Sequence, residues 1–265
     1  MDRTIIHFPE KIKSAVQGDK YNIDDIGMSG SEVLLFEDKV LKIQFQNEEA
    51  DNEYKMMEWL QAKVPVPEVL EFQCENGRDF LLMTKIQGKM ADDEYEEDQD
   101  KLTAILAEGL KMLWKVDIKD CPCNYNLDKK LQLAAYNVEH NLVDVDNVNL
   151  ETFGENGFKD PAELLKWLVE NRPQEELVLA HGDYCPSNIL VDKGRINGFI
   201  DLTRTGICDK WQDIALCYRS LKDNFEEAYP GKMYEDYYKD TLFEELDIEP
   251  DWNKVRYYML MDELF

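Results

Sequence analysis

Residues 178–201 read VLAHGDYCPSNILVDKGRINGFID and decide the fold. Three short apolar runs alternate with polar turns in this stretch, which predicts buried strands joined by tight turns. Asp183, Asn188 and Asp201 then stand at the ends of those strands. Because buried strands are rigid, we expect the two carboxylates and the amide to be held near one point.

The spacing of these three polar residues indicates phosphoryl transfer. Asn188 follows Asp183 by five residues, and Asp201 follows Asn188 by thirteen. One carboxylate can orient an attacking hydroxyl, while the amide and the other carboxylate hold Mg²⁺ against phosphates. Protein kinases have an arrangement of this form. An isolated HGD is weak support, whereas HGDxxxxN followed by an apolar strand and FID is much more specific.

Composition limits the class of protein and its partners. With 265 residues and 44% hydrophobic residues, the chain is expected to be globular, with one large domain or two lobes. The net charge of −26 argues against nucleic acid and anionic membranes as partners. It suits a cationic small molecule, although acidity for solubility explains it equally well. No apolar run approaches the roughly 18 residues of a membrane span. The N-terminus has no signal-peptide core, so we expect a cytoplasmic protein.

The cysteines predict neither disulfides nor a zinc site. Cys121-Pro122-Cys123 lacks zinc-knuckle spacing, no second pair answers it, and the chain has only three histidines. We expect all six cysteines to be free thiols in a reducing compartment.

The first part of the chain predicts a small antiparallel sheet with helices. Lys42 lies inside an apolar strand and faces either solvent or a cleft. A downstream helix offers four acids as its partner. The Gly27–Ser31 turn is either an ordinary hairpin or a phosphate-covering loop. Helices are expected at 1–17 and 48–62, strands at 20–26, 33–36, 40–45, 68–74 and 79–84, and the four acids are Glu48, Glu49, Asp51 and Glu53.

The rest of the chain predicts a mainly helical region. Residues 84–88 are the expected linker, which divides the chain into an N-terminal lobe of residues 1–86 and a C-terminal lobe of residues 87–265. The fold class is therefore α+β. Asp160-Pro161-Ala162-Glu163 is expected to start a helix as a capping box. Helices are expected at 101–116, 127–140, 161–171, 209–225, 231–246 and 252–264, with a polar loop at 141–159.

Longer motifs resemble one enzyme family. The run HGDYCPSNILVDKGRINGFIDLTRTGICDKWQDIALCYRSL closely resembles the aminoglycoside 3′-phosphotransferases, which are kanamycin-type antibiotic kinases with a protein-kinase-like fold. EWLQAKVPVPEVL, FLLMT, FKDPAELLKWL and the terminal YYMLMDELF match as well. The resemblance extends from Gly27 to Phe265. It implies a two-lobed kinase-like fold and transfer of the ATP γ-phosphate, with Mg²⁺, to the 3′-hydroxyl of kanamycin or neomycin, causing resistance.

The resemblance also implies roles for single residues. Asp183 matches the catalytic aspartate, and Asn188 and Asp201 match the magnesium ligands. Lys42 matches the lysine on the α- and β-phosphates, and the resemblance selects Glu53 as its partner. The remaining matches are Met28, Ser29 and Gly30 in the phosphate-covering loop, Thr84 and Ile86 at the adenine hinge, Arg204 near the catalytic aspartate, and Asp213 as a support of the catalytic loop.

The implied acceptor pocket is acidic, and three positions depart from the family pattern. Carboxylates bind a polycationic aminoglycoside by charge-assisted hydrogen bonds. Val40 replaces an aromatic residue that stacks on adenine, which leaves GTP open as a donor. Pro186 and Asn224 each replace an acid, so the substrate range is expected to be shifted. The pocket residues are Asp223, Asn224, Glu263 and the Phe265 carboxylate, with residues 144–157 as a flap.

Two alternatives of different classes remain beside the antibiotic kinase. One is a kinase of the same fold that acts on another small-molecule hydroxyl, and the other is a pseudokinase that only binds. The complete set of catalytic residues disfavours the pseudokinase. A protein kinase is disfavoured because the motif is HGD rather than HRD. Monomer and homodimer both stay open.

Overall fold

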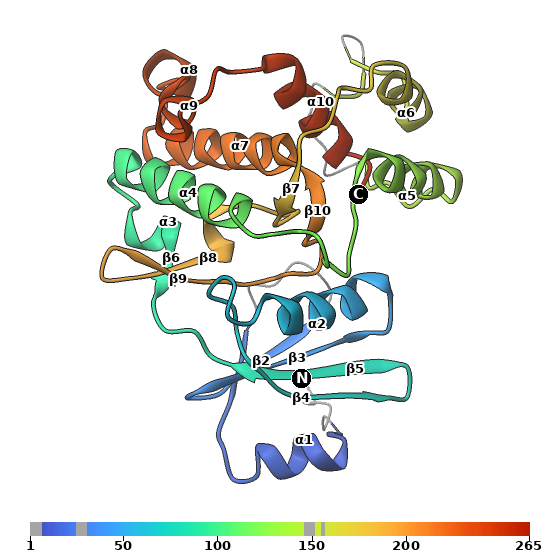
Figure 1. The fold of residues 1–265 in the computed structure, drawn as a ribbon, viewed down its shortest axis with the longest axis vertical. Helices are drawn as coiled ribbons and strands as arrows, with labels where there is room; N and C mark the ends of the chain where they lie inside the picture. Colours follow the sequence, from blue (N-terminus) through green and yellow to red (C-terminus); the bar gives the residue numbers. More distant parts are fainter. Residues whose placement is uncertain (1–6, 25–30, 146–151, 155–156) are drawn as a thin grey trace.

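The computed structural model describes residues 7–24, 31–145, 152–154 and 157–265. They form two lobes, a five-stranded antiparallel sheet with helices and a larger, mainly helical part (Figure 1). The expected α+β, two-lobed architecture is confirmed. The sheet has the order β1 (Asn22–Asp24), β2 (Glu32–Leu35), β3 (Lys39–Phe45), β5 (Arg78–Thr84) and β4 (Val69–Glu75).

The turn between β4 and β5 has the chemistry of a tight hairpin. Asn76 and Gly77 both have positive φ, at 52° and 76°. A two-residue turn of this kind matches the right-handed twist of the strands and favours Asn-Gly. The hairpin predicted from the sequence is therefore confirmed.

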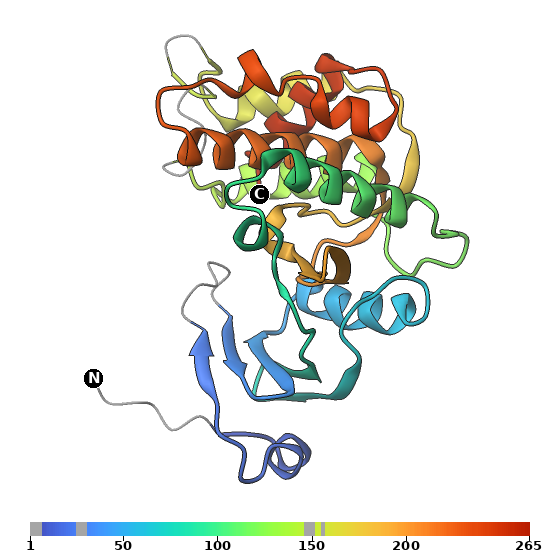
Figure 2. The same ribbon diagram turned by 90° about the vertical axis from the view of Figure 1, so that its left-hand side faces the viewer.

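The two faces of this sheet pack against different helices. On one face, Leu41, Ile43 and Phe80 share a buried cluster with Ile12 of α1 (Glu10–Ala15). Leu81 and Met83 belong instead to the core that includes α2 (Glu48–Leu60). Because side chains alternate along a strand, Lys42, which pairs with Leu81, points to the α2 side. In both views α2 lies between this sheet and the larger lobe (Figure 2).

The larger lobe places helices around two small sheets. The first sheet pairs β7 with β10, and the second has the order β6-β8-β9. Lys193 and Gly194, with φ of 52° and 75°, form the tight turn of the β8–β9 hairpin. The strands are β6 Lys89–Met90, β7 Leu177–Ala180, β8 Ile189–Asp192, β9 Arg195–Phe199 and β10 Gly206–Asp209. The helices are α3 Ala91–Glu94, α4 Gln99–Trp114, α5 Leu127–Glu139, α6 Pro161–Glu170, η1 Pro186–Asn188, α7 Lys210–Ala228, α8 Tyr234–Tyr237, α9 Thr241–Leu246 and α10 Trp252–Asp262.

The helix expected over 231–246 is wrong, because two short helices replace it. Tyr234 and Phe243 are both buried in the same core. Nine residues at about 100° each would place them on opposite sides of one helix. The break at residues 238–240 lets both rings face the core.

The helix expected over 1–17 is shorter. It begins after Pro9 and ends at Ala15, before Gly18 at a φ of 85°. Its expected first residues, 1–6, lie outside the described residues. None of the helices in the described ranges is long and apolar enough to cross a membrane. All six cysteines are free.

Candidate active site

The loop that carries Asp183 begins where β7 ends, at His181 and Gly182. Gly182 has a φ of 86°, and a Cβ there would lie 2.1 Å from the carbonyl oxygen of Arg204. Only glycine fits this conformation and this contact. The buried carboxylate of Asp213, on α7, accepts backbone hydrogen bonds from His181 at 2.6 Å and Gly182 at 2.9 Å. The loop is thus held by the helix behind it.

Asp183 and Asn188 are joined by direct hydrogen bonds. Nδ2 of Asn188 donates to the backbone oxygen of Asp183 at 2.9 Å and to its Oδ2 at 3.1 Å. Because Nδ2 bonds Asp183, the amide oxygen Oδ1 is the side-chain atom of Asn188 that could ligate a cation. The buried hydroxyl of Tyr184 donates to the Leu106 backbone oxygen at 2.7 Å and anchors the loop to α4.

Asp201 follows β9 in a left-handed conformation, with a φ of 56°. Its Oδ1 accepts from Nζ of Lys42 at 3.1 Å and from the Thr203 hydroxyl at 3.2 Å. Lys42 Nζ also lies 3.0 Å from Oε2 of Glu53. The structure therefore selects Glu53 from the four acids that the sequence pattern left open, and buries Lys42 rather than exposing it to solvent.

Charge pairing outweighs burial at Lys42 and Asp201, whereas at Glu53 burial outweighs the Lys42 charge and raises the pKa of the carboxyl. Burial alone would lower the pKa of Lys42, but the charges of Glu53 and Asp201 outweigh it and raise that pKa. Burial opposes ionisation of Asp201, yet the Lys42 charge holds its pKa below the usual value. Both groups are therefore charged at neutral pH.

The oxygen donors fit a phosphate-bound Mg²⁺. Asn188 and Asp201 supply an amide and a carboxylate oxygen, and the backbone N–H of Ile200 donates to the Asn188 carbonyl at 3.0 Å, which ties the two segments together. The described residues contain no group of three or more His, Cys, Asp or Glu that could hold a metal alone. Mg²⁺ commonly takes one or two protein ligands and completes its shell with phosphate oxygens and water.

The structure describes only some of the residues predicted to bind the nucleotide. Thr84 ends β5, where its N–H donates to the Glu68 carbonyl at 2.9 Å and its hydroxyl accepts from the Glu68 N–H. The Ile86 side chain covers Gly198 of β9. Val40 is partly buried on β3, beside Met83. Met28, Ser29 and Gly30 lie outside the described residues.

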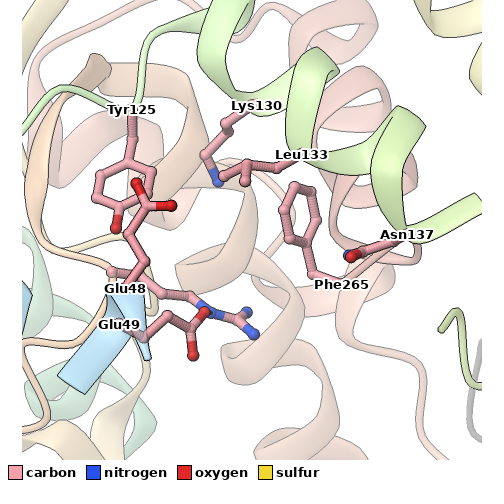
Figure 3. Close-up of a pocket in the computed structure, with 8 residues that line it drawn as sticks. Glu48, Glu49, Tyr125, Lys130, Leu133, Asn137 and Phe265 are labelled. Carbon is pink, nitrogen blue, oxygen red and sulfur yellow. The ribbon is translucent and has the colours of Figure 1, made fainter. Parts of the chain in front are cut away.

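A pocket lies where α2, α5 and the C-terminus meet. Figure 3 shows Glu48 and Glu49 across from Lys130 and Phe265. Nε of Arg204 donates to Oε1 of Glu49 at 3.1 Å, and its guanidinium lies 5.9 Å from the centre of the Phe265 ring. Glu49 thus pairs with Arg204 and not with Lys42. The other residues lining the pocket are Tyr125, Leu133 and Asn137.

The acidic positions expected around the acceptor lie on α7 and at the end of α10. Asp262, which was not among the expected residues, lies next to them: its Oδ2 is 2.6 Å from Nη2 of Arg219, and its Oδ1 is 4.0 Å from Nη1 of Arg204. Glu263 follows α10 directly. Asp223 is exposed on α7, and Asn224 donates to the Ser220 carbonyl at 2.8 Å within that helix.

Two further expectations concern the acceptor side of the site. Pro186, which was expected to shift the substrate range because it replaces an acid, is buried as the first residue of η1. Much of the expected flap, residues 146–151 and 155–156, lies outside the described residues.

Sequence reasoning missed several contributors to the site. Glu49, Lys130 and Asn137 line the pocket, and Asn137 donates to the Leu264 carbonyl at 2.9 Å. Asn52 donates to the segment after Asp201. No motif distinguishes these side chains from other polar residues on a helix, so only their neighbours in space could have identified them.

Comparisons with known proteins agree on one family. The model of the phosphotransferase enzyme family matches residues 27–258. An aminoglycoside 3′-phosphotransferase of Enterococcus faecalis is 42% identical over 82% of this chain and 79% of its own. One of Niallia circulans is 34% identical over the whole of both chains. The solved structure of an aminoglycoside 3′-phosphotransferase of type VIII superposes with a TM-score of 0.79 at 25% identity, covering 96% of this chain and 97% of its own.

Proposed function

The chain belongs to the phosphotransferase enzyme family, and we propose that it inactivates aminoglycosides by transferring the γ-phosphate of ATP to their 3′-hydroxyl. The observation that carries this proposal is a chain of contacts among Lys42, Asp183, Asn188 and Asp201. The Lys42–Asp201 bond crosses the two lobes, Asn188 bonds Asp183, and the Ile200 N–H ties the Asp201 segment to Asn188. Curated relatives with the same named activity support the acceptor class. Such an activity would give resistance to the antibiotic.

Each residue in the cluster has one part in the proposed reaction. Asp183 accepts the proton of the attacking hydroxyl or orients it, and Asn188 holds the Asp183 carboxylate in place. Lys42 binds the α- and β-phosphates, while Glu53 holds its ammonium group beside Asp201. Mg²⁺, when bound by Asn188 and Asp201, neutralises charge on the phosphates. Transfer is direct and in line, so positioning and electrostatics supply the catalysis.

The nucleotide is assigned to the N-terminal lobe. In this proposal residues 1–86 bind ATP, and residues 87–265 carry the metal ligands and the acceptor pocket. The backbone of Thr84 and Ile86 binds adenine, and residues 28–30 cover the phosphates. Val40 offers an aliphatic contact to the base in place of stacking, which admits GTP as a second donor.

The acceptor is assigned to the pocket near the C-terminus, where Glu48 and Glu49 lie beside Lys130, Arg204 and Phe265. Aminoglycosides are polycations, and Glu263 and the Phe265 carboxylate can accept hydrogen bonds from their ammonium groups, whereas Asp262 already pairs with Arg219. Asp223 and Asn224, near the C-terminal end of α7, are the remaining residues proposed to contact the acceptor. We place the reaction in the cytoplasm, where ATP is available.

The decisive experiment is a coupled ADP-release assay with an acceptor panel. Kanamycin, which has the 3′-hydroxyl, should be turned over, and tobramycin, which lacks it, should not. Asp183→Asn, which keeps the size of the side chain, should lower kcat by at least about 100-fold, the contribution of a positioned general base. Turnover of an unrelated sugar or amino alcohol without turnover of kanamycin would overturn the acceptor assignment, and an active Asp183→Asn variant would overturn the catalytic one.

A further inference from the structure

One face of α2 contacts three parts of the active site. Glu49, Asn52 and Glu53 have the spacing i, i+3 and i+4, which brings side chains together on one side of a helix. Glu49 binds Arg204, and Glu53 binds Lys42. Asn52 lies between them and is only 3% exposed. Glu49 and Glu53 therefore already have partners in the pocket and at Lys42. Asn52 has no part in the reaction described above.

Asn52 donates into the loop that follows Asp201. Its Nδ2 lies 2.7 Å from the Thr203 carbonyl oxygen and 3.0 Å from that of Thr205. A third carbonyl, that of Leu202, lies at 3.5 Å. Three backbone acceptors around one amide nitrogen require the NH₂ group to face the loop, because the amide oxygen would be repelled there.

The loop that Asn52 holds also contacts the catalytic loop. Thr205 donates from its N–H to the Leu202 carbonyl at 3.1 Å and from its hydroxyl to the His181 carbonyl at 2.9 Å. Asp201, at the start of this loop, has the left-handed φ of 56° that non-glycine residues rarely adopt. Such a conformation persists only when its surroundings hold it. Asn52 supplies that support from the opposite lobe.

We propose that Asn52 is a positioning residue that fixes the magnesium-binding carboxylate of Asp201 by bonding the backbone of residues 202–205. The proposal rests on the metal role assigned to Asp201 above. Glu53 and Asn52 then act side by side: Glu53 acts on Asp201 through Lys42, and Asn52 acts on it through the backbone. A movement of α2 would change both contacts together.

The amide is the chemically required group at this position. Asn52→Asp keeps the shape but turns a carboxylate toward three carbonyl oxygens, while Asn52→Ala removes the donor without adding charge. Each variant should weaken the magnesium-dependent part of nucleotide binding about 10-fold, in the range seen when residues that orient metal ligands are removed. ADP affinity without Mg²⁺ should change less than about 2-fold, because the adenine and phosphate contacts stay.

Calorimetric titration of ADP, with and without Mg²⁺, measures this directly. The Mg²⁺ concentration for half-maximal kanamycin turnover should also rise about 10-fold, with little change in the KM for kanamycin. Asn171→Asp is the matched control, since Asn171 donates to a single carbonyl, that of Trp167, on the exposed end of α6. It should behave as the wild type.

The results separate this proposal from the assignment of the metal site. If both Asn52 variants fold and keep the full Mg²⁺-dependent gain in ADP affinity, the positioning role is wrong. If affinity falls equally with and without Mg²⁺, Asn52 is only structural, and the role is again wrong. An Asp201→Asn variant that keeps the Mg²⁺-dependent gain would instead overturn the metal role of Asp201.

Discussion

Lys42 and Asp201 are 159 residues apart in the sequence, and Nζ of the lysine lies 3.1 Å from Oδ1 of the aspartate. The contact joins the two lobes at the site where the phosphates are expected. Lys42 is 6% exposed and Glu53, its second partner, is 2% exposed. A buried charge needs its partner, so this triad governs stability as well as chemistry.

Removing Lys42 should destabilise the fold. Lys42→Ala leaves the Glu53 carboxylate buried without a cation, which costs about 3–5 kcal/mol. Adding Glu53→Gln should recover much of this loss, because a neutral amide replaces the unpaired charge, yet activity should stay low in both variants. Chemical denaturation measures the free energy of unfolding. If Lys42→Ala alone is as stable as the wild type, the stabilising role of the Lys42–Glu53 pair is wrong.

Asp213 should control the order of the catalytic loop. Asp213→Asn removes one of the two acceptors for the N–H groups of His181 and Gly182, which costs about 1.5–3 kcal/mol for a hydrogen bond to a charged group. Amide exchange at Gly182 should become faster and kcat should fall. Asp251→Asn is the control, since Asp251 accepts two backbone bonds at the start of α10 on Oδ1 alone, and an amide oxygen can keep both. Equal loss of kcat in both variants would refute a specific role.

Two glycines with similar backbone angles should respond differently to alanine. Gly182 and Gly231 have φ of 86° and 83°, but only Gly182 has a backbone oxygen 2.1 Å from the position of an added Cβ. Gly231→Ala should cost about 1 kcal/mol of unfolding free energy through its backbone angle alone. Gly182→Ala should cost more and also lower kcat, because the Arg204 backbone must move. Thermal unfolding and steady-state kinetics test this pair, and equal effects would contradict the prediction.

The end of the chain should act on acceptor binding. The Phe265 ring lies 5.3 Å from Nζ of Lys130, near the Arg204 guanidinium. Phe265→Ala removes the ring but keeps a terminal carboxylate, whereas deletion of Phe265 moves that carboxylate to Leu264. Deletion should raise the KM for kanamycin more than Phe265→Ala does, and neither should change the KM for ATP more than about 2-fold. If the KM for ATP changes most, the pocket is assigned to the wrong substrate.

Glu176 should make stability depend on acid pH. Hydrogen bonding to Lys210, with further bonds to Trp211 and Lys254, lowers its pKa from 4.5 to about 2. A lowered folded-state pKa gives stability that is present above pH 4.5 and is lost as the pH falls toward 2. The side chain is 52% exposed, so solvent screening limits this to about 1 kcal/mol. Glu176→Gln should therefore be less stable at pH 7, and the difference should narrow between pH 5 and 3 in denaturation curves. A constant difference would contradict the linkage.

Local sequence determined the parts of the site that depend on short-range geometry. The Lys193-Gly194 turn fixes the register of β8 and β9, and so places Asp201 a set distance after Asn188. The Asn76-Gly77 turn likewise fixes the register of β4 and β5. Turn residues with positive φ and alternating apolar residues determine strand pairing locally, because the pairing starts from the turn. The separation of Asn188 and Asp201 along the chain therefore indicated their placement before any contact was known.

Only the tertiary structure decided which side chains meet across the lobes. Four acids near the start of α2 were equivalent in the sequence pattern, and the packing of that helix directs Glu53 to Lys42 and Glu49 to Arg204. Asn52 has no motif at all, and its three carbonyl partners lie about 150 residues away. Helix periodicity indicates which face is buried, but not which segment that face meets. The choice of partner depends on long-range packing, which no local pattern encodes.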